Sequence, residues 1–237
     1  MGHDQPPGPH HGGDPSKGRR QDRKRLSCPV ASWGAGTGAE AGEHEAPQGV
    51  VVIEALKDRY TIVAPALSGS GATTDTGSPL TVDDLAAQVL GAVNAADLDA
   101  FHLAGHSLGA TVAAAVAGKH PERVRSLFLH AGWAVTDAWQ EFQFDLWQRL
   151  LRADKDLLSR VLQVTAIGAG TLADRGIEDF EQGVAGFNEL FDVKGMARQS
   201  ELNTRVDITA VRIAGRLRLR VPAWATNGAP AGLDSVA

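Results

Sequence analysis

The sequence predicts an α/β protein, a mostly parallel sheet flanked by helices, and two observations carry this prediction. Between about residues 60 and 130, short β-rich apolar runs alternate with amphipathic helical patterns. Parallel strands need a crossover of a dozen or more residues, which is usually a helix. From about residue 135 to 212 the pattern is helical throughout, which predicts a helical layer added to the sheet.

The composition excludes several classes of protein. The chain has 237 residues, of which 43% are hydrophobic and 22% charged, as in a globular domain with a buried core. The net charge of -5 gives no reason to expect a nucleic-acid or membrane partner. The sequence has no run of about 18 apolar residues, so it predicts no membrane span. A single cysteine, Cys28, excludes an internal disulfide, so we expect a cytoplasmic protein.

Residues 1–48 differ in composition from the rest of the chain. They hold six of the eleven prolines and a basic run over residues 17–25. Without apolar periodicity, this segment cannot bury enough surface to offset the entropy lost on ordering. We therefore predict a disordered Gly/Pro/basic arm, with the basic run solvated. The pair His10-His11 has no further ligands at metal spacing, so it predicts no metal site.

We predict that ordered structure begins near residue 50. Residues 51–56 permit a helix, and residues 60–64 read as a buried strand that Pro65 ends. Thr81 is placed as the N-cap of an amphipathic helix. The apolar residues of that helix recur at helical spacing and are Val82, Leu85, Ala86, Val89 and Val93.

Two more strands follow, with a helix between them. Residues 100–104 predict a strand, and the next helix runs from Leu108 to about His120, before Pro121. Residues 126–129 predict the last strand of this series. Beyond it, six apolar residues lie close to one helical stripe: Trp139, Phe142, Leu146, Trp147, Leu150 and Leu151.

The most specific motif is Gly105-His106-Ser107-Leu108-Gly109, between a predicted strand and a small-residue helix. This is a G-x-S-x-G nucleophile elbow in its expected context. A sharp turn would hold the serine in a strained conformation where a base and a substrate carbonyl can reach it. The flanking glycines leave room for strand and helix to cross. The Leu108 amide, at the positive end of the helix, is placed to stabilise an oxyanion.

On these residues the chain resembles the α/β-hydrolase family, in its small-molecule serine esterase and lactonase-like branch, over about residues 50 to 222. The resemblance rests on Tyr60-Thr61-Ile62-Val63-Ala64-Pro65, Gly69-Ser70-Gly71, the elbow, and Pro121-Glu122-Arg123-Val124. It implies that Ser107 is the nucleophile and that the Leu108 amide is one oxyanion donor. It also implies that a helical cap, about residues 135–212, covers an apolar pocket. The aromatic candidates for lining this pocket are Trp133, Trp139, Phe142 and Trp147.

The sequence departs from the family pattern in three places. Residues 26 to 50 lack the usual apolar strand ending in His-Gly, which supplies the second oxyanion donor. Ala66 stands where the family usually has an aspartate. All eight histidines lie at or before His130, so no histidine follows Asp234, the residue nearest the expected acid position. We therefore expect residues 49–237 to form an incomplete domain, truncated at the carboxyl end.

One other histidine is a candidate base. His130 ends the strand beside the elbow strand, at the edge where open α/β sheets place their sites. Adjacent strands lie about 4.8 Å apart, so its side chain could approach Ser107, with Asp137 orienting it. The competing interpretation is that the His130 side chain faces away from the pocket.

The expected function is hydrolysis of a small apolar ester, thioester or lactone through an acyl-enzyme on Ser107. Without the usual histidine, we expect this activity to be impaired. The alternatives are a catalytically inactive relative that binds a small molecule or a protein, and a non-functional truncated product. No motif predicts a cofactor or a metal. The oligomeric state is left open.

Overall fold

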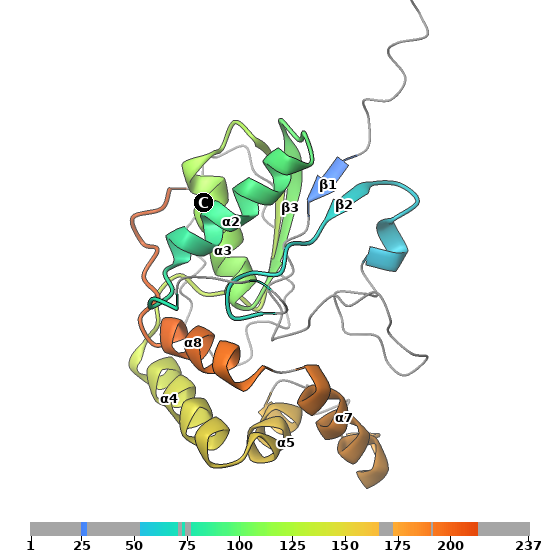
Figure 1. The fold of residues 1–237 in the computed structure, drawn as a ribbon, viewed down its shortest axis with the longest axis vertical. Coiled ribbons are helices and arrows are strands. Elements are labelled where there is room, and N and C mark those ends of the chain that lie inside the picture. Colours follow the sequence, from blue (N-terminus) through green and yellow to red (C-terminus); the bar gives the residue numbers. More distant parts are fainter. Residues whose placement is uncertain are drawn as a thin grey trace, which may run out of the picture.

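The computed structural model describes residues 25–27, 53–70, 73, 77–165, 173–190 and 192–212. Four strands form one parallel sheet in the order β2-β1-β3-β4 (Figure 1). They are β1 (Arg25–Ser27), β2 (Thr61–Val63), β3 (Phe101–His106) and β4 (Val124–His130). The predicted parallel α/β architecture is therefore confirmed.

The strand β1 was not predicted. It lies within the segment expected to be a disordered arm, and it pairs with β2 on one side and β3 on the other. Within that segment, Arg25–Ser27 form a strand because backbone pairing on both sides holds them, and their charged neighbours in the sequence give no signal for it. The rest of residues 1–48 lies outside the described residues.

Two helices, α2 (Val82–Ala95) and α3 (Leu108–Lys119), pack side by side on one face of the sheet (Figure 1). As predicted, Thr81 caps α2, where its hydroxyl oxygen accepts a hydrogen bond from the Asp84 amide at 3.1 Å. The helix α3 is buried along nearly its whole length, because small residues allow close packing on β3 and β4.

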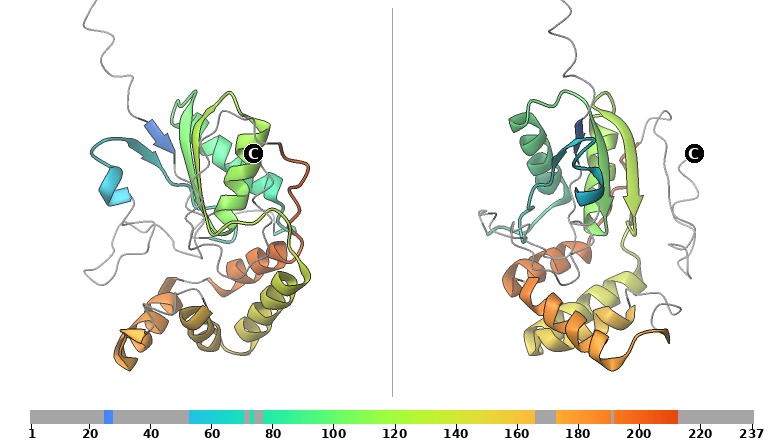
Figure 2. Two further views of the ribbon diagram at one scale, coloured as in Figure 1. Left: turned by 180° about the vertical axis from the view of Figure 1, so that it is seen from behind. Right: turned by 90° about the vertical axis from the view of Figure 1, so that its right-hand side faces the viewer.

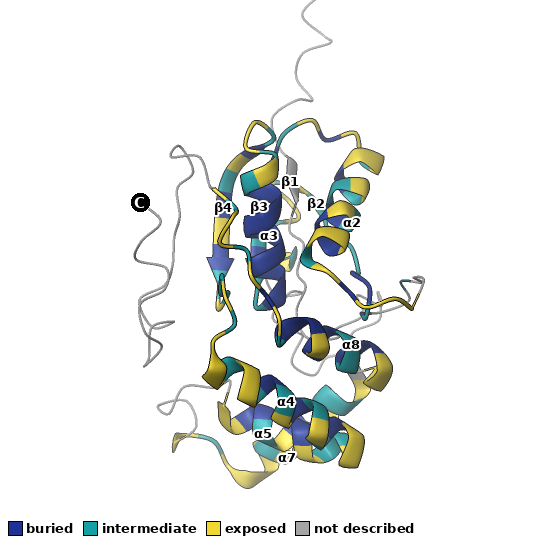
Figure 3. Cartoon of the chain, turned by 90° about the vertical axis from the view of Figure 1, so that its left-hand side faces the viewer, coloured by how far each residue is buried: buried dark blue, intermediate teal, exposed yellow. Residues whose placement is uncertain are grey.

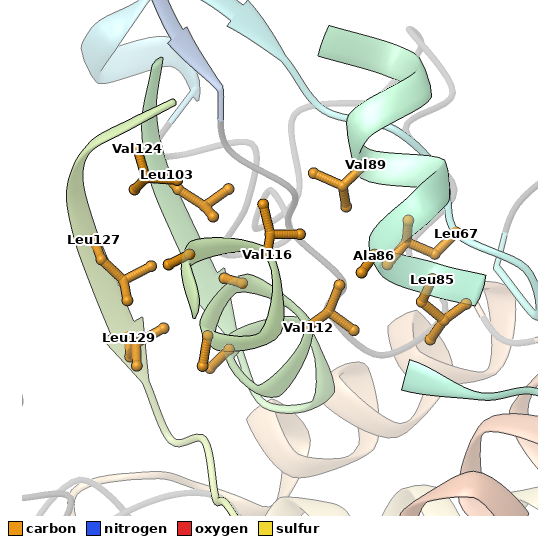
Figure 4. Close-up of a cluster of buried hydrophobic side chains, with 14 of the residues drawn as sticks. Leu67, Leu85, Ala86, Val89, Leu103, Val112, Val116, Val124, Leu127 and Leu129 are labelled. Atoms are coloured by element: carbon orange, nitrogen blue, oxygen red, sulfur yellow. The ribbon is translucent and has the colours of Figure 1, made fainter. Parts of the chain in front are cut away.

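The main core lies between this sheet face and these two helices (Figure 4). The strands contribute Leu103, Leu127 and Leu129, and the helices contribute Val89 and Val116. Strand residues alternate between the two faces. On β3 the residues at positions 102, 104 and 106 are therefore half-buried and point to the opposite face of the sheet, where Phe128 is 45% exposed.

Among the described residues, four helices form a second layer at the carboxyl ends of β3 and β4, and we call them the cap helices (Figure 2). They are α4 (Ala138–Ala153), α5 (Lys155–Thr165), α7 (Ile177–Leu190) and α8 (Val193–Asn203). The helix α8 lies nearest the sheet, and α4, α5 and α7 lie beyond it (Figure 1). No helix in the described ranges is long and apolar enough to cross a membrane.

The segments entering and leaving the cap helices are joined. Val135 and Asp207 form an antiparallel bridge, and the Thr136 amide donates to the Val206 carbonyl at 2.9 Å. The Thr136 hydroxyl donates to the Asn203 carbonyl at 2.6 Å. These bonds join the segments at the two ends of the cap helices.

The cap helices have their own core, which includes Phe144, Trp147, Leu151, Leu158 and Met196. The buried face of α4 is therefore offset from the predicted stripe. Trp139 and Phe142 are 68% and 73% exposed. Figure 3 colours α4 by burial and shows both buried and exposed residues along it. The predicted stripe is therefore wrong as a buried face for Trp139 and Phe142, whereas its members Trp147 and Leu151 are buried.

This offset gives a direct test with a matched control on one helix. Trp147→Ala is expected to lower the free energy of unfolding by about 3–5 kcal/mol, because it leaves a cavity in the core of the cap helices. Trp139→Ala, at an exposed position, is expected to change it by about 0.5 kcal/mol or less. Urea unfolding followed by circular dichroism measures both. Equal losses would contradict the burial assigned to Trp147.

Candidate active site

The backbone at Ser107 makes a sharp turn between β3 and α3. Its φ of 53° and ψ of -127° lie in a region that L-residues rarely adopt. Such a conformation costs on the order of 1–3 kcal/mol and persists only where its surroundings enforce it. The predicted strand-turn-helix context of the elbow is therefore present.

Glycine is required before this turn because the strand and helix touch there. A Cβ on Gly105 would lie 2.7 Å from the Ala110 Cα and would overlap the Gly109 carbonyl oxygen. Real Cβ atoms do not approach backbone atoms so closely. The close crossing of β3 and α3 thus holds the chain in the strained turn at Ser107.

The backbone of Ser107 is hydrogen-bonded through both its amide and its carbonyl. Its amide donates to the His130 carbonyl at 2.9 Å, and its carbonyl accepts from the Ala110 amide at 2.9 Å. Its side chain makes no capping bond to α3. The Leu108 amide lies in the first turn of α3, where amides have no intrahelical acceptor and the helix dipole is positive. This corner can therefore offer a hydroxyl nucleophile beside an anion-stabilising amide.

Two histidines lie together beside the turn. His106 and His130 are paired in the β3-β4 register, and their Nδ1 atoms are 2.6 Å apart. Their rings are stacked, with centroids 4.7 Å apart and planes 25° from parallel. Burial, and to a lesser degree the neighbouring His130, lowers the pKa of His106 to about 4. Burial also lowers the pKa of His130. Both rings are therefore neutral at pH 7.

The low pKa of His106 predicts acid sensitivity. Between an ordinary unfolded value of about 6.5 and the folded value of about 4, the unfolded chain binds more protons. Stability should therefore fall as the pH falls through this window, by about 2–3 kcal/mol at pH 4.5. Urea midpoints at pH 7 and 4.5 measure the loss. His106→Asn should lose less, whereas His120→Asn, at the C-cap of α3, should behave as wild type. Equal losses in all three would contradict this assignment.

The structure uses Asp137 differently from the role considered for it. Its carboxylate caps α4 and accepts a hydrogen bond from the Gln140 amide at 2.8 Å, while the Gln140 side chain accepts from the Asp137 amide. Asp137 is thus part of a capping box. The His130 Nδ1 lies against His106 instead.

The four aromatic candidates fall into two groups. Trp133 packs on both the main core and the core of the cap helices, and its carbonyl accepts from the Thr111 hydroxyl at 2.8 Å. Phe144 lies between Trp133 and Trp147, with ring centroids 5.3 and 5.0 Å away. Trp139 and Phe142 lie on the exposed face of α4. The structure therefore brings two of the four together, and a role for any of them in a pocket stays a prediction.

A buried polar network ties the loop after β2 to the cap helices. The Gln199 side chain on α8 donates to the Ser68 carbonyl at 3.1 Å and to the Ser70 hydroxyl at 2.7 Å. The Gln88 side chain on α2 donates to the Ser68 hydroxyl at 2.7 Å. Gly69 and Gly195 allow the two backbones to approach, since a Cβ on either would overlap the other segment. This network seats α8 over the sheet.

Sequence reasoning missed the contact between His106 and His130. A signal for it was present, because each histidine ends a predicted strand and neighbouring parallel strands bring their carboxyl ends together. No group of three or more His, Cys, Asp or Glu within the described ranges is placed to hold a metal ion.

Comparison with known families and proteins agrees with this fold. The model of the family described as alpha/beta hydrolase fold matches residues 36–168. Pyrrolizixenacetamide deacetylase from Xenorhabdus hominickii is 36% identical over 159 residues, which are 67% of this chain and 60% of the deacetylase. A protein from Azorhizobium caulinodans named for carbamate hydrolysis is 33% identical over 119 residues, which are 50% of this chain and 43% of that protein. The chain thus spans about half of the length of these relatives.

Solved structures share the fold at low sequence identity. An α/β-hydrolase enzyme from a deep-sea metagenome library aligns with a TM-score of 0.70 and 14% identity, covering 85% of this chain and 71% of that one. The enol-lactonase from Burkholderia xenovorans LB400 aligns with a TM-score of 0.65 and 17% identity, covering 86% of this chain and 73% of that one. These likenesses show the fold alone.

Proposed function

The chain belongs to the α/β-hydrolase family, and from this premise we propose that it hydrolyses a small apolar ester, thioester or lactone through an acyl-enzyme on Ser107. The observation that carries the proposal is the strained turn, with φ of 53° and ψ of -127°, between β3 and α3. Strain of this kind costs free energy and is typical of functional sites. In the proposed reaction, Ser107 Oγ attacks the acyl carbon, and the Leu108 amide donates to the developing oxyanion.

The relatives' names support carbonyl chemistry of this kind. One is named for removing an acetyl group from an acetamide and another for hydrolysing a carbamate. Esters, amides and carbamates are all cleaved by addition to a carbonyl and loss of a leaving group. We therefore place this chain among hydrolases of small acyl compounds and give an ester with a short acyl chain as the first substrate to try.

The experiment compares wild type with Ser107→Ala on p-nitrophenyl acetate, butyrate and octanoate and on acetanilide. We expect release of the leaving group by wild type, above the rate with Ser107→Ala, for at least one short acyl substrate. If the two proteins give equal rates on every substrate, the hydrolase proposal is wrong. The competing role is then that of an inactive relative that binds a small molecule or a protein. The capping bond of Asp137, which occupies the carboxylate considered for orienting His130, favours that alternative.

A further inference from the structure

The helix α4 carries a row of exposed apolar side chains that ends in an arginine. Trp139, Phe142 and Leu146 are all exposed, and they recur at spacings of three and four residues. Arg149 follows at a further spacing of three, and its side chain is also largely exposed. At about 100° per residue, these four side chains lie within roughly 80° of the helix circumference. We call this row the α4 seam.

The α4 seam faces away from the other cap helices. The opposite side of α4 holds Phe144, Trp147 and Leu151, which belong to the core shared with α5 and α8. Figure 1 shows α4 at the outer edge of this layer. A contiguous exposed row of large apolar side chains marks an interaction site more often than an ordinary surface. Alternating spacings of three and four residues are those along which two helices pair.

We propose that the α4 seam pairs with the α4 seam of a second copy of this chain, with the two helices antiparallel. The two inner residues of the seam are Phe142 and Leu146, and each meets the other in the second copy. The two outer residues behave likewise, so Trp139 of each copy lies against Arg149 of the other. Such a contact is related to itself by a two-fold axis, as in most protein dimers. The pairing does not depend on the chemistry proposed for Ser107.

The charges along the seam favour this orientation and this partner. Arg149 Nε donates to Asp145 Oδ2 at 2.6 Å, so the two side chains balance each other's charge. Antiparallel pairing brings the planar guanidinium of Arg149 onto the indole of Trp139, a stacking and cation–π contact. Parallel pairing would bring Arg149 against Arg149, and like charges repel. An anionic membrane is disfavoured as the partner because the chain has a net charge of -5.

A contact made by one pair of helices is small, so we expect a weak dimer. Its dissociation constant should be on the order of 10–100 µM. Well below that concentration the chain is monomeric, and the pairing does not affect its unfolding. Sedimentation velocity on the full chain measures the association, at concentrations from about tenfold below to about tenfold above that value.

The first variant tests the centre of the seam. Phe142→Glu places a carboxylate without a partner between the two helices and should raise the dissociation constant at least about tenfold. Ile177→Glu, on α7, is the matched control, because Ile177 is 72% exposed and Phe142 is 73% exposed. The control should stay within about twofold of wild type. Both variants should keep the circular dichroism spectrum of the wild type.

A double-mutant cycle tests the antiparallel orientation. Trp139→Ala and Arg149→Gln should each raise the dissociation constant by about three- to tenfold. The double variant should be little weaker than the weaker of the two single variants, because both changes remove the same contact. Within one chain the two residues are about 15 Å apart along α4, so coupling between them arises only across the pair of helices.

Several results would overturn the inference. One is a chain that stays monomeric at every concentration, and another is a dimer that Phe142→Glu weakens no more than Ile177→Glu does. Additive effects of Trp139→Ala and Arg149→Gln, or a tighter dimer in Arg149→Gln, would contradict the antiparallel pairing. If the chain is monomeric and Phe142→Glu raises the KM for an acyl ester, the seam binds substrate and not a second copy.

Discussion

Replacing Ser107 with glycine is expected to make the protein more stable and to abolish hydrolysis. The φ of 53° and ψ of -127° strain any residue with a Cβ, by on the order of 1–3 kcal/mol. Glycine tolerates this conformation, although its greater freedom in the unfolded chain offsets about 0.5–1 kcal/mol of the gain. A net increase of about 1 kcal/mol in the free energy of unfolding should result. The lost hydroxyl should lower kcat by about 10⁶-fold where a base assists it, and by less where none does.

Ser107→Ala is the matched control for this prediction. It removes the same hydroxyl, so its activity should be as low as that of Ser107→Gly. It keeps the Cβ and therefore the strain, so its stability should stay near that of wild type. Urea unfolding and ester hydrolysis measured on the same preparations separate the two effects. If Ser107→Gly is less stable than Ser107→Ala, the turn is not strained in the way described.

The second large effect is expected at Gly105, where a methyl group has no room. In Gly105→Ala the new Cβ would meet the backbone of Gly109 and Ala110, and the amino-terminal turn of α3 would have to move. We expect a loss of about 3 kcal/mol in the free energy of unfolding, because backbone atoms cannot rotate away as a side chain can. The displacement would also move the Leu108 amide, so hydrolysis should fall together with stability.

Gly91 provides the control for this substitution. It is exposed on α2, and apart from its own helix no atom of the described residues lies within 4 Å of the place that a methyl group would take. Gly91→Ala should raise the free energy of unfolding by about 0.5–1 kcal/mol, since alanine favours the helix. Urea denaturation of both variants compares the same change of residue at a closed and an open position. A Gly105→Ala variant as stable as Gly91→Ala would contradict the close crossing of β3 and α3.

The local elements around the elbow could be predicted because their signals are short in range. Alternating apolar residues predict β3, small residues predict the buried α3, and Pro121 predicts the end of that helix. The glycines of the motif predict the close crossing. None of these inferences needs knowledge of residues distant in sequence, which is why the structure agrees with them.

The features that sequence missed depend on contacts between distant segments. The strand β1 is held by neighbours on both sides, and its own three residues carry little β signal. The buried face of α4 depends on its packing against Met196 and Leu158, which lie on other helices. Periodicity along α4 alone therefore could not tell which of its apolar residues are buried. The bond between His106 and His130 depends on the register of β3 against β4, which strand prediction does not fix.

The most direct test of the account is the mass of the purified protein after reaction with an alkyl fluorophosphonate. The strained turn and the Leu108 amide predict a single adduct, which peptide mapping places on Ser107. Ser107→Ala should remain unmodified under the same conditions. An unmodified wild-type protein, or an adduct on another residue, would contradict the claim that Ser107 is a nucleophile.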